Sequence, residues 1–117
     1  MARAVGLAHR FTQAAALPAE SAHRLAVVVE EWVANIVEHG AARPGSLVVV
    51  TLERAGAGVR LDFSDAGVAF DPREAEDAGP NLHRGGGAGL ALIRNWSEIE
   101  SYARARGRNR LVLRSRS

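Results

Sequence analysis

The amino-acid sequence predicts a two-layer α/β (α+β) sandwich, in which helices cover one face of a mixed, mainly antiparallel sheet. Apolar residues recur at helical spacing in two early segments, whereas four later segments are rich in β-branched residues or alternate between apolar and polar positions. The length of 117 residues fits one domain over residues 1–117. The order helix, helix, strand, strand, loop, helix, strand, strand then places the helices on one face of the sheet.

Two helices are expected at the start of the chain. The first, over residues 2–16, has Val5, Ala8, Phe11 and Ala15 at helical spacing. Leu17-Pro18 ends it, and because proline suits the first turn of a helix, a longer helix is expected over residues 19–41. The apolar stripe that this second helix turns toward the core consists of Leu25, Val28, Val29, Trp32, Val33 and Ile36.

The rest of the chain changes period. Residues 46–53 are rich in β-branched side chains and predict a strand, and residues 54–58 predict a turn. Residues 59–64 alternate between apolar and polar side chains, as expected for the second strand of an antiparallel hairpin. Residues 65–87 predict a loop, and a loop this long in a small domain usually has a function. A helix is expected over 88–96, and a hairpin over 98–103 and 110–114 with its turn near 107–109.

Composition excludes several classes of protein. The chain has no cysteine, so it has neither a disulfide framework nor a thiolate metal site. No apolar run approaches the roughly 20 residues of a membrane span, and the start is too polar for a signal peptide. We therefore expect a soluble, cytoplasmic protein that does not contact a membrane.

All 15 basic residues are arginine, but the formal net charge is only +2. Six of them gather near the end of the chain: Arg104, Arg106, Arg108, Arg110, Arg114 and Arg116. Such a strip could contact phosphates of a nucleic acid, or it could be a solvated strand face followed by a frayed tail. Because no aromatic residues are interleaved for base stacking, a nucleic-acid partner is not expected.

Three polar residues stand four apart on the second predicted helix: Glu31, Asn35 and His39. This spacing puts them in one row beside the apolar stripe, and therefore at the edge of the core. A carboxylate, an amide and an imidazole in such a place need partners, which a bound metal ion and phosphate would supply. The row is also compatible with an ordinary amphipathic helix whose polar residues recur at four.

Two glycine-containing segments follow. Asp65-Ala66-Gly67 comes directly after a predicted strand, where glycine lets the backbone approach a ligand closely, although ordinary strand-end turns have the same pattern. Residues 85–90, Gly-Gly-Gly-Ala-Gly-Leu, open into a helix, and the free N–H groups of a helix N-terminus bind anions such as phosphate. A flexible loop before a helix would have the same composition, and the segment is not a P-loop.

The order of these three segments resembles the N-box and the two glycine boxes of GHKL ATPases, which have the histidine kinase-like (Bergerat) fold. Residues 29–40, Val-Glu-Glu-Trp-Val-Ala-Asn-Ile-Val-Glu-His-Gly, are similar to the helix motif of the anti-sigma-factor serine/threonine-protein kinases. Residues 65–72 and 86–93 resemble the two glycine boxes of that family. The resemblance continues through residues 98–113 and covers nearly the whole chain.

The resemblance implies ATP and Mg²⁺ as cofactors. Asn35 would coordinate Mg²⁺, and Glu31 would act as the general base one helical turn earlier. Asp65 would accept a hydrogen bond from the adenine amino group, with Gly67 leaving space for the ring. The remaining nucleotide contacts are expected from His39, Phe70, Gly86, Gly87, Gly89 and Leu90, with residues 70–87 as a mobile lid.

The family also implies partners. The chain would be an anti-sigma regulatory kinase that binds a sigma factor and phosphorylates a serine or threonine of an anti-anti-sigma (STAS-type) antagonist. A non-catalytic nucleotide-binding interaction module of the same fold is the alternative, and a homodimer is compatible with either. Intact Glu31 and Asn35 favour the enzyme, because a pure binding module has no chemical need for the pair.

The sequence departs from the family pattern in three places. Ala69 stands where the broader superfamily has a second glycine. Asn109 and Arg110 stand where many GHKL families have a threonine near the adenine. The chain begins almost at its first helix, so an N-terminal strand of the family is expected to be either absent or lost by truncation.

Overall fold

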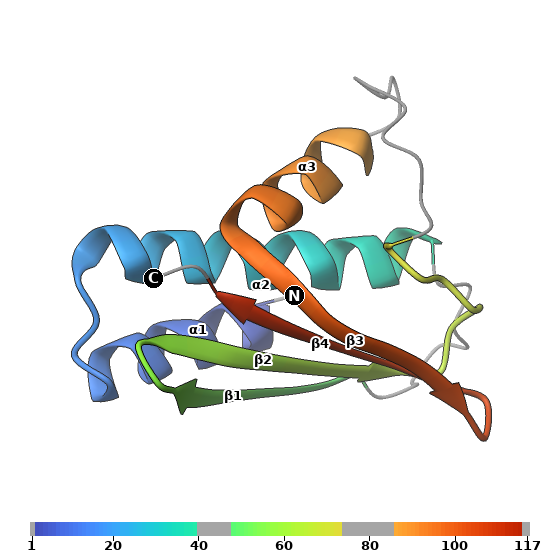
Figure 1. Ribbon diagram of the computed structural model, residues 1–117, viewed down its shortest axis with the longest axis horizontal. Helices are drawn as coiled ribbons and strands as arrows, with labels where there is room; N and C mark the ends of the chain where they lie inside the picture. The colour runs from blue at the N-terminus through green and yellow to red at the C-terminus, as the bar shows by residue number, and fades with distance from the viewer. Residues whose placement is uncertain (1, 40–47, 74–85, 116–117) are drawn as a thin grey trace.

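A computed structural model describes residues 2–39, 48–73 and 86–115 (Figure 1). These ranges contain the helices α1 (Ala2–Ala14), α2 (Ala19–His39) and α3 (Gly86–Trp96). They also contain the strands β1 (Val49–Ala55), β2 (Gly58–Asp65), β3 (Ser97–Ala105) and β4 (Arg108–Ser115). The order of elements is the predicted one, and the predicted α/β class is confirmed.

The four described strands form one sheet in the order β1-β2-β4-β3. Each of its three pairings is antiparallel, although a partly parallel sheet was expected. The reason is that β1–β2 and β3–β4 are both hairpins, and two-residue turns reverse the chain. The crossover through α3 leads to the edge strand β3, and the hairpin turn then brings β4 beside β2, also in the antiparallel direction. The two central strands are therefore β2 and β4, which are neighbours in space but far apart in the sequence.

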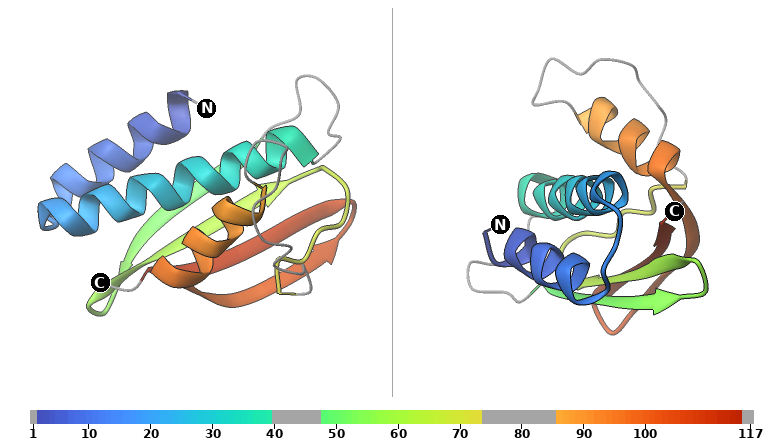
Figure 2. Two further views of the ribbon diagram at one scale, coloured as in Figure 1. Left: turned by 90° about the horizontal axis from the view of Figure 1, so that it is seen from above. Right: turned by 90° about the vertical axis from the view of Figure 1, so that its left-hand side faces the viewer.

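All three helices lie on one face of the sheet (Figure 2). Their apolar faces and the inward side chains of β2 and β4 form the core between the layers. Phe63 is fully buried in β2 and meets the ring of Trp32 from α2 edge-on, with 6.5 Å between the ring centroids. The other large, fully buried apolar side chains are Leu61, Leu111, Leu113, Val28, Val29, Ile93 and Pro72.

Both hairpin turns are shorter than predicted. The first occupies residues 56 and 57 instead of 54–58, with Gly56 at a φ of 61°. The second occupies residues 106 and 107 instead of 107–109, because Arg106 and Gly107 take up the positive φ values of 54° and 73° that a type I′ turn requires. Asn109 therefore lies inside β4 and not in the turn.

The helix ends also differ from the prediction. α1 ends at Ala14, two residues early, and Ala16 has a positive φ of 53° before Pro18 starts the next segment. α3 begins at Gly86, so its glycines form its first turn, where a preceding loop was expected. The predicted end of the second helix at 40–41 and the predicted strand start at 46–47 lie outside the described residues.

Near the end of the chain, Arg104, Arg106 and Arg110 are exposed, as expected for a solvated strand face. Three arginines of β4 also bond to groups of other strands. Arg110 binds the Asp62 carboxylate across the β2–β4 pair with an N–O distance of 2.5 Å, and this hydrogen bond raises the pKa of Arg110. Arg114 donates to the Ala55 carbonyl at 2.7 Å, and Arg108 donates to Ser64 Oγ at 3.0 Å.

Within the described ranges, none of the helices has the length and apolar character needed to cross a membrane.

Candidate functional site

A small pocket lies between α2 and the end of the sheet where β2 stops and β4 starts. It is lined by Trp32, Asn35, Ile36, Asp65, Val68, Phe70 and Asn109. Asn35 and Asp65, from two of the three motifs, therefore share one pocket. Its interior of about 20 Å³ has room for about one water molecule.

Asp65 is the last residue of β2, one position further into the strand than predicted. It continues the inward register of Leu61 and Phe63, so a carboxylate occupies a position that the strand otherwise gives to apolar side chains. Only 5% of Asp65 is exposed. Its Oδ1 accepts hydrogen bonds from the Gly67 N–H at 2.9 Å and from Asn109 Nδ2 at 3.1 Å. Its Oδ2 accepts none from the described residues, and Asp65 is one of the residues that line the pocket.

Asn109 is the cross-strand partner of Asp65 in the β2–β4 register and is equally buried, with 5% exposed. Its Nδ2 also donates to the carbonyls of Val68 at 2.8 Å and Gly67 at 3.3 Å. The sequence pattern places Asn109 in the predicted turn and indicates no role for it. A signal was present: Asn109 alternates with Leu111 and Leu113, so it is a polar residue at an inward strand position.

The aromatic wall of the pocket comes from Trp32 and Phe70, whose ring centroids are 6.0 Å apart. Trp32 was predicted as a core residue, and it is one, but it also lines the pocket. Its indole Nε1 is buried without a hydrogen-bond partner among the described residues. Such an orphaned donor costs about 1–3 kcal/mol, which a hydrogen-bond acceptor in the pocket would offset.

The structure describes two of the three side chains in the polar row on α2. Asn35 is half-buried and lines the pocket, and Glu31 is half-buried one turn earlier but does not line it. Neither side chain has a hydrogen bond or ion pair within the described part of the chain, so both remain available to a ligand. His39 is the last described residue of α2, and its side chain lies outside the described set.

The second glycine segment forms the N-terminal turn of α3, where Gly86, Gly87 and Gly89 contribute backbone N–H groups. Leu90 was predicted as a nucleotide contact, and the structure buries its side chain in the core. Of the predicted lid, only residues 70–73 and 86–87 are among those described.

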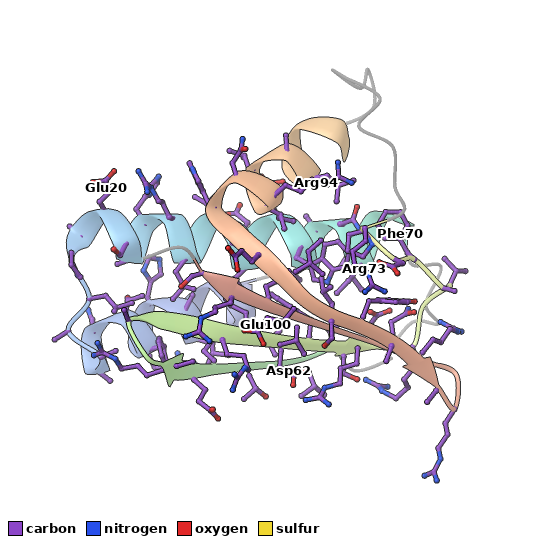
Figure 3. The ribbon with its side chains drawn as sticks, in the orientation of Figure 1. Glu20, Asp62, Phe70, Arg73, Arg94 and Glu100 are labelled. Carbon is purple, nitrogen blue, oxygen red and sulfur yellow. The ribbon has the colours of Figure 1, made fainter. Side chains whose placement is uncertain are left out.

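The start of that lid segment is tied to the rest of the fold. The Phe70 N–H donates to the Tyr102 hydroxyl at 3.2 Å, and Arg94 of α3 donates to the Pro72 carbonyl at 2.8 Å. Figure 3 shows Phe70, Arg73 and Arg94 in this region, where the segment meets α3. The Arg73 side chain, hydrogen-bonded to Asp71, lowers the pKa of the Asp71 carboxyl, and the Arg73 backbone N–H and charge add to this effect.

The described residues offer few ligands for a metal ion, so they suit a cation that takes most of its ligands from phosphate and water. No three histidine or acidic side chains gather anywhere in the described ranges in a way that could hold a metal ion. Asn35 offers one amide oxygen at the pocket, a hard donor that Mg²⁺ accepts, and Mg²⁺ commonly takes its remaining ligands from phosphates and water. The residues present therefore fit Mg²⁺ that is bound together with a polyphosphate.

Comparisons with known proteins agree with this geometry. The family described as histidine kinase-like ATPase domain matches residues 1–115. The serine/threonine-protein kinase BtrW of Bordetella bronchiseptica is 36% identical over 104 residues, which cover 80% of this chain and 69% of that protein.

Two solved structures of the blue-light activated histidine kinase of Erythrobacter litoralis EL346 share the fold. The structure of its histidine kinase domain has a TM-score of 0.60 at 19% identity, covering 85% of this chain and 48% of that one. The other has a TM-score of 0.60 at 21% identity, covering 85% of this chain and 31% of that one. The chain thus spans less than half the length of either solved structure.

Proposed function

The chain belongs to the histidine kinase-like ATPase family, and on that premise we propose that it is an ATP- and Mg²⁺-dependent serine/threonine protein kinase. Its substrate would be a serine or threonine of a STAS-type anti-anti-sigma antagonist, and it would also bind a sigma factor. The observation that carries the proposal is the shared pocket, in which Asn35 of α2 and Asp65 of β2 face one space.

Each side of the pocket has a chemical role in the proposal. The free Oδ2 of Asp65 would accept a hydrogen bond from the amino group of adenine. Asn35 would hold Mg²⁺, which supplies charge neutralisation for the phosphates when it is bound. The N–H groups of Gly86, Gly87 and Gly89 would bind phosphate oxygens at the positive end of the α3 dipole.

Glu31 would be the general base. As the hydroxyl oxygen of the substrate bonds to the γ-phosphorus, its proton would pass to the Glu31 carboxylate, and the bond from phosphorus to the bridging oxygen would break to release ADP. Glu31 is half-buried and has no hydrogen bond or ion pair to a described residue, so its carboxylate is available to take that proton.

Cytoplasmic localisation is part of the same proposal.

The kinase assignment and the partner assignment have different support. A relative named as a serine/threonine-protein kinase, 36% identical, supports phosphoryl transfer. The sigma factor and the antagonist depend on the resemblance of the helix motif from Val29 to Gly40 to that of the anti-sigma-factor kinases. Fold alone does not determine a partner, so both need direct tests.

Calorimetric titration with ATP, with and without Mg²⁺, is the first test. We expect binding that tightens when Mg²⁺ is present. Absent binding, or binding that ignores the metal, would contradict the proposal.

Phosphoryl transfer from labelled ATP to a purified STAS-domain antagonist is the second test. Glu31→Gln should keep nucleotide affinity within about threefold but lower the transfer rate by about 100-fold or more, the usual effect of removing a general base. Glu30→Gln, at the exposed neighbouring position on the same helix, is the matched control and should leave transfer unchanged. Equal transfer by the two variants would remove Glu31 from its role. ATP binding without transfer to any antagonist would indicate a non-catalytic module.

A further inference from the structure

Three side chains of the β3–β4 hairpin hold the segment that follows β2. Tyr102, through its hydroxyl, accepts the Phe70 N–H at 3.2 Å. Arg104 donates from Nη1 to the Gly67 carbonyl at 2.9 Å. Asn109 donates to the Val68 carbonyl at 2.8 Å and to the Asp65 carboxylate at 3.1 Å. Residues 65–70 are thereby attached to the hairpin along their whole length.

Tyr102, Arg104 and Asn109 also bind one another. The Oδ1 of Asn109 accepts a hydrogen bond from the Tyr102 hydroxyl and another from Arg104 Nη1 at 3.0 Å. Two donors on the oxygen side determine which way the amide faces, because the NH₂ group must then point to the opposite side. That opposite side is occupied by Asp65 Oδ1 and the carbonyls of Gly67 and Val68.

We propose that Asn109 is a positioning residue for nucleotide-base recognition, holding the Asp65 carboxylate with Oδ1 engaged and Oδ2 directed to the pocket as an acceptor. This inference rests on the proposed ATP binding. Asn109 does not contact the base through its amide, because both N–H groups and the carbonyl oxygen are already used within the protein. Its effect on the nucleotide passes through Asp65.

The arrangement has a consequence for selectivity. An ionised carboxylate held in this way can only accept hydrogen bonds, so it favours a purine with an amino group at position 6. A purine with hydrogen at that position forms no such bond. If Asn109 loses its donor, only the Gly67 N–H still holds Asp65 Oδ1, so the carboxylate is less constrained and the discrimination between the two purines falls. Loss of a purely structural contact would instead weaken the binding of both purines equally.

The test compares ATP with purine riboside triphosphate, which lacks only the 6-amino group, by calorimetric titration of the full chain. For the wild-type chain we expect ATP to bind about 10- to 100-fold more tightly, the range for a hydrogen bond to a charged group. Asn109→Asp keeps the side-chain shape but replaces the donor with an acceptor, and it should bring the two affinities within about threefold. Asn95→Asp makes the same chemical change at an exposed position on α3 and should keep the wild-type preference.

Tyr102→Phe is the milder second variant, which removes one of the two donors to Asn109 Oδ1 together with the acceptor of the Phe70 N–H. It should reduce the preference for ATP by about threefold to tenfold and tests the same inference if Asn109→Asp does not fold. A full wild-type preference in either folded variant would overturn the positioning role of Asn109. A wild-type chain that binds both triphosphates equally would also overturn it, while leaving the proposed ATP binding intact. Failure of the wild-type chain to bind ATP would overturn the proposed function itself.

Discussion

The two walls of the pocket are built in opposite ways. On the sheet side, formed by Asp65, Asn109 and the backbone of residues 67–68, polar groups are buried and hydrogen-bonded to one another. On the helix side, Asn35 lines the pocket and Glu31 lies one turn earlier, outside its lining. Both polar side chains are half-buried and have no hydrogen bond to the described residues. Apart from Asp65 Oδ2, the polar groups of the sheet side have partners before a ligand arrives, whereas those of the helix side lack partners among the described residues.

This difference separates stability from function. A buried hydrogen-bonded group contributes to folding, and its loss leaves partners unsatisfied at a cost of about 1–3 kcal/mol. A polar group that has no partner in the fold contributes little to stability, but it is available to a bound ion or substrate. Substitutions on the sheet side should therefore affect both folding and binding, and substitutions on the helix side should affect binding or transfer alone.

The largest expected effect comes from removing the support that both sides share. Phe63→Ala removes a fully buried ring that lies below Asp65 in β2 and meets Trp32 of α2. We expect the free energy of unfolding to fall by about 3–5 kcal/mol, as for other buried Phe→Ala changes, measured by urea denaturation. Val49→Ala, at a half-exposed apolar position in β1, is the control and should change it by less than about 0.5 kcal/mol. Similar losses in the two variants would mean that Phe63 is not a central support.

Asp65→Ala, on the sheet side, should lower both the free energy of unfolding and the affinity for ATP. The Gly67 N–H loses its acceptor and Asn109 Nδ2 loses one of three, so unfolding should become easier by about 1–3 kcal/mol, and ATP binding should be lost. Asp62→Ala removes a carboxylate from the same strand on its outer face and should cost less stability and no ATP affinity. Urea denaturation and calorimetry measure the two quantities, and unchanged stability of Asp65→Ala would contradict the contrast between the walls.

Asn35→Ala, on the helix side, should weaken ATP binding in the presence of Mg²⁺ without lowering stability. Because the Asn35 side chain has no hydrogen bond to the described residues and alanine favours helices, the free energy of unfolding should stay within about 0.5 kcal/mol of wild type. The gain in ATP affinity on adding Mg²⁺ should largely disappear in the same variant. Asn95→Ala on α3 controls for the helix propensity of alanine. A strongly destabilised Asn35→Ala variant would show that the helix side is structural after all.

The smallest effect concerns the segment just beyond the sheet side. Hydrogen bonding from Arg73 lowers the pKa of Asp71, so the folded state favours the ionised carboxylate. The resulting stabilisation is fully present when the pH is above 3.8, the ordinary pKa of this carboxyl group. It is lost as the pH falls through the lowered pKa of the folded state. Because the Arg73 side chain is about half exposed, we expect less than about 1 kcal/mol. Urea denaturation of wild type and Asp71→Asn should give a difference at pH 6 that vanishes near pH 2, and a constant difference would contradict it.

Much of the fold could be predicted because its signals are local. The helical spacing of Leu25, Val29 and Trp32 predicted the buried face of α2, and the alternation of Leu61 and Phe63 predicted the inward face of β2. The predicted bounds were wrong at several element ends, because a few backbone angles determine where a helix or strand stops. Positive φ values at Arg106 and Gly107 shortened the second turn and moved Asn109 into a strand.

The sequence by itself determined the elements of the fold, the polar row on α2, and the residues that resemble nucleotide-binding motifs. These depend on neighbours within one or two helical turns, whose spacing is visible along the chain. Only the tertiary structure decided that Asn109 faces Asp65, because the two are 44 residues apart and meet through the pairing of β2 with β4. Strand order is set by how helices and strands bury their apolar faces together, and that packing determines which polar groups satisfy one another and which are left for a ligand.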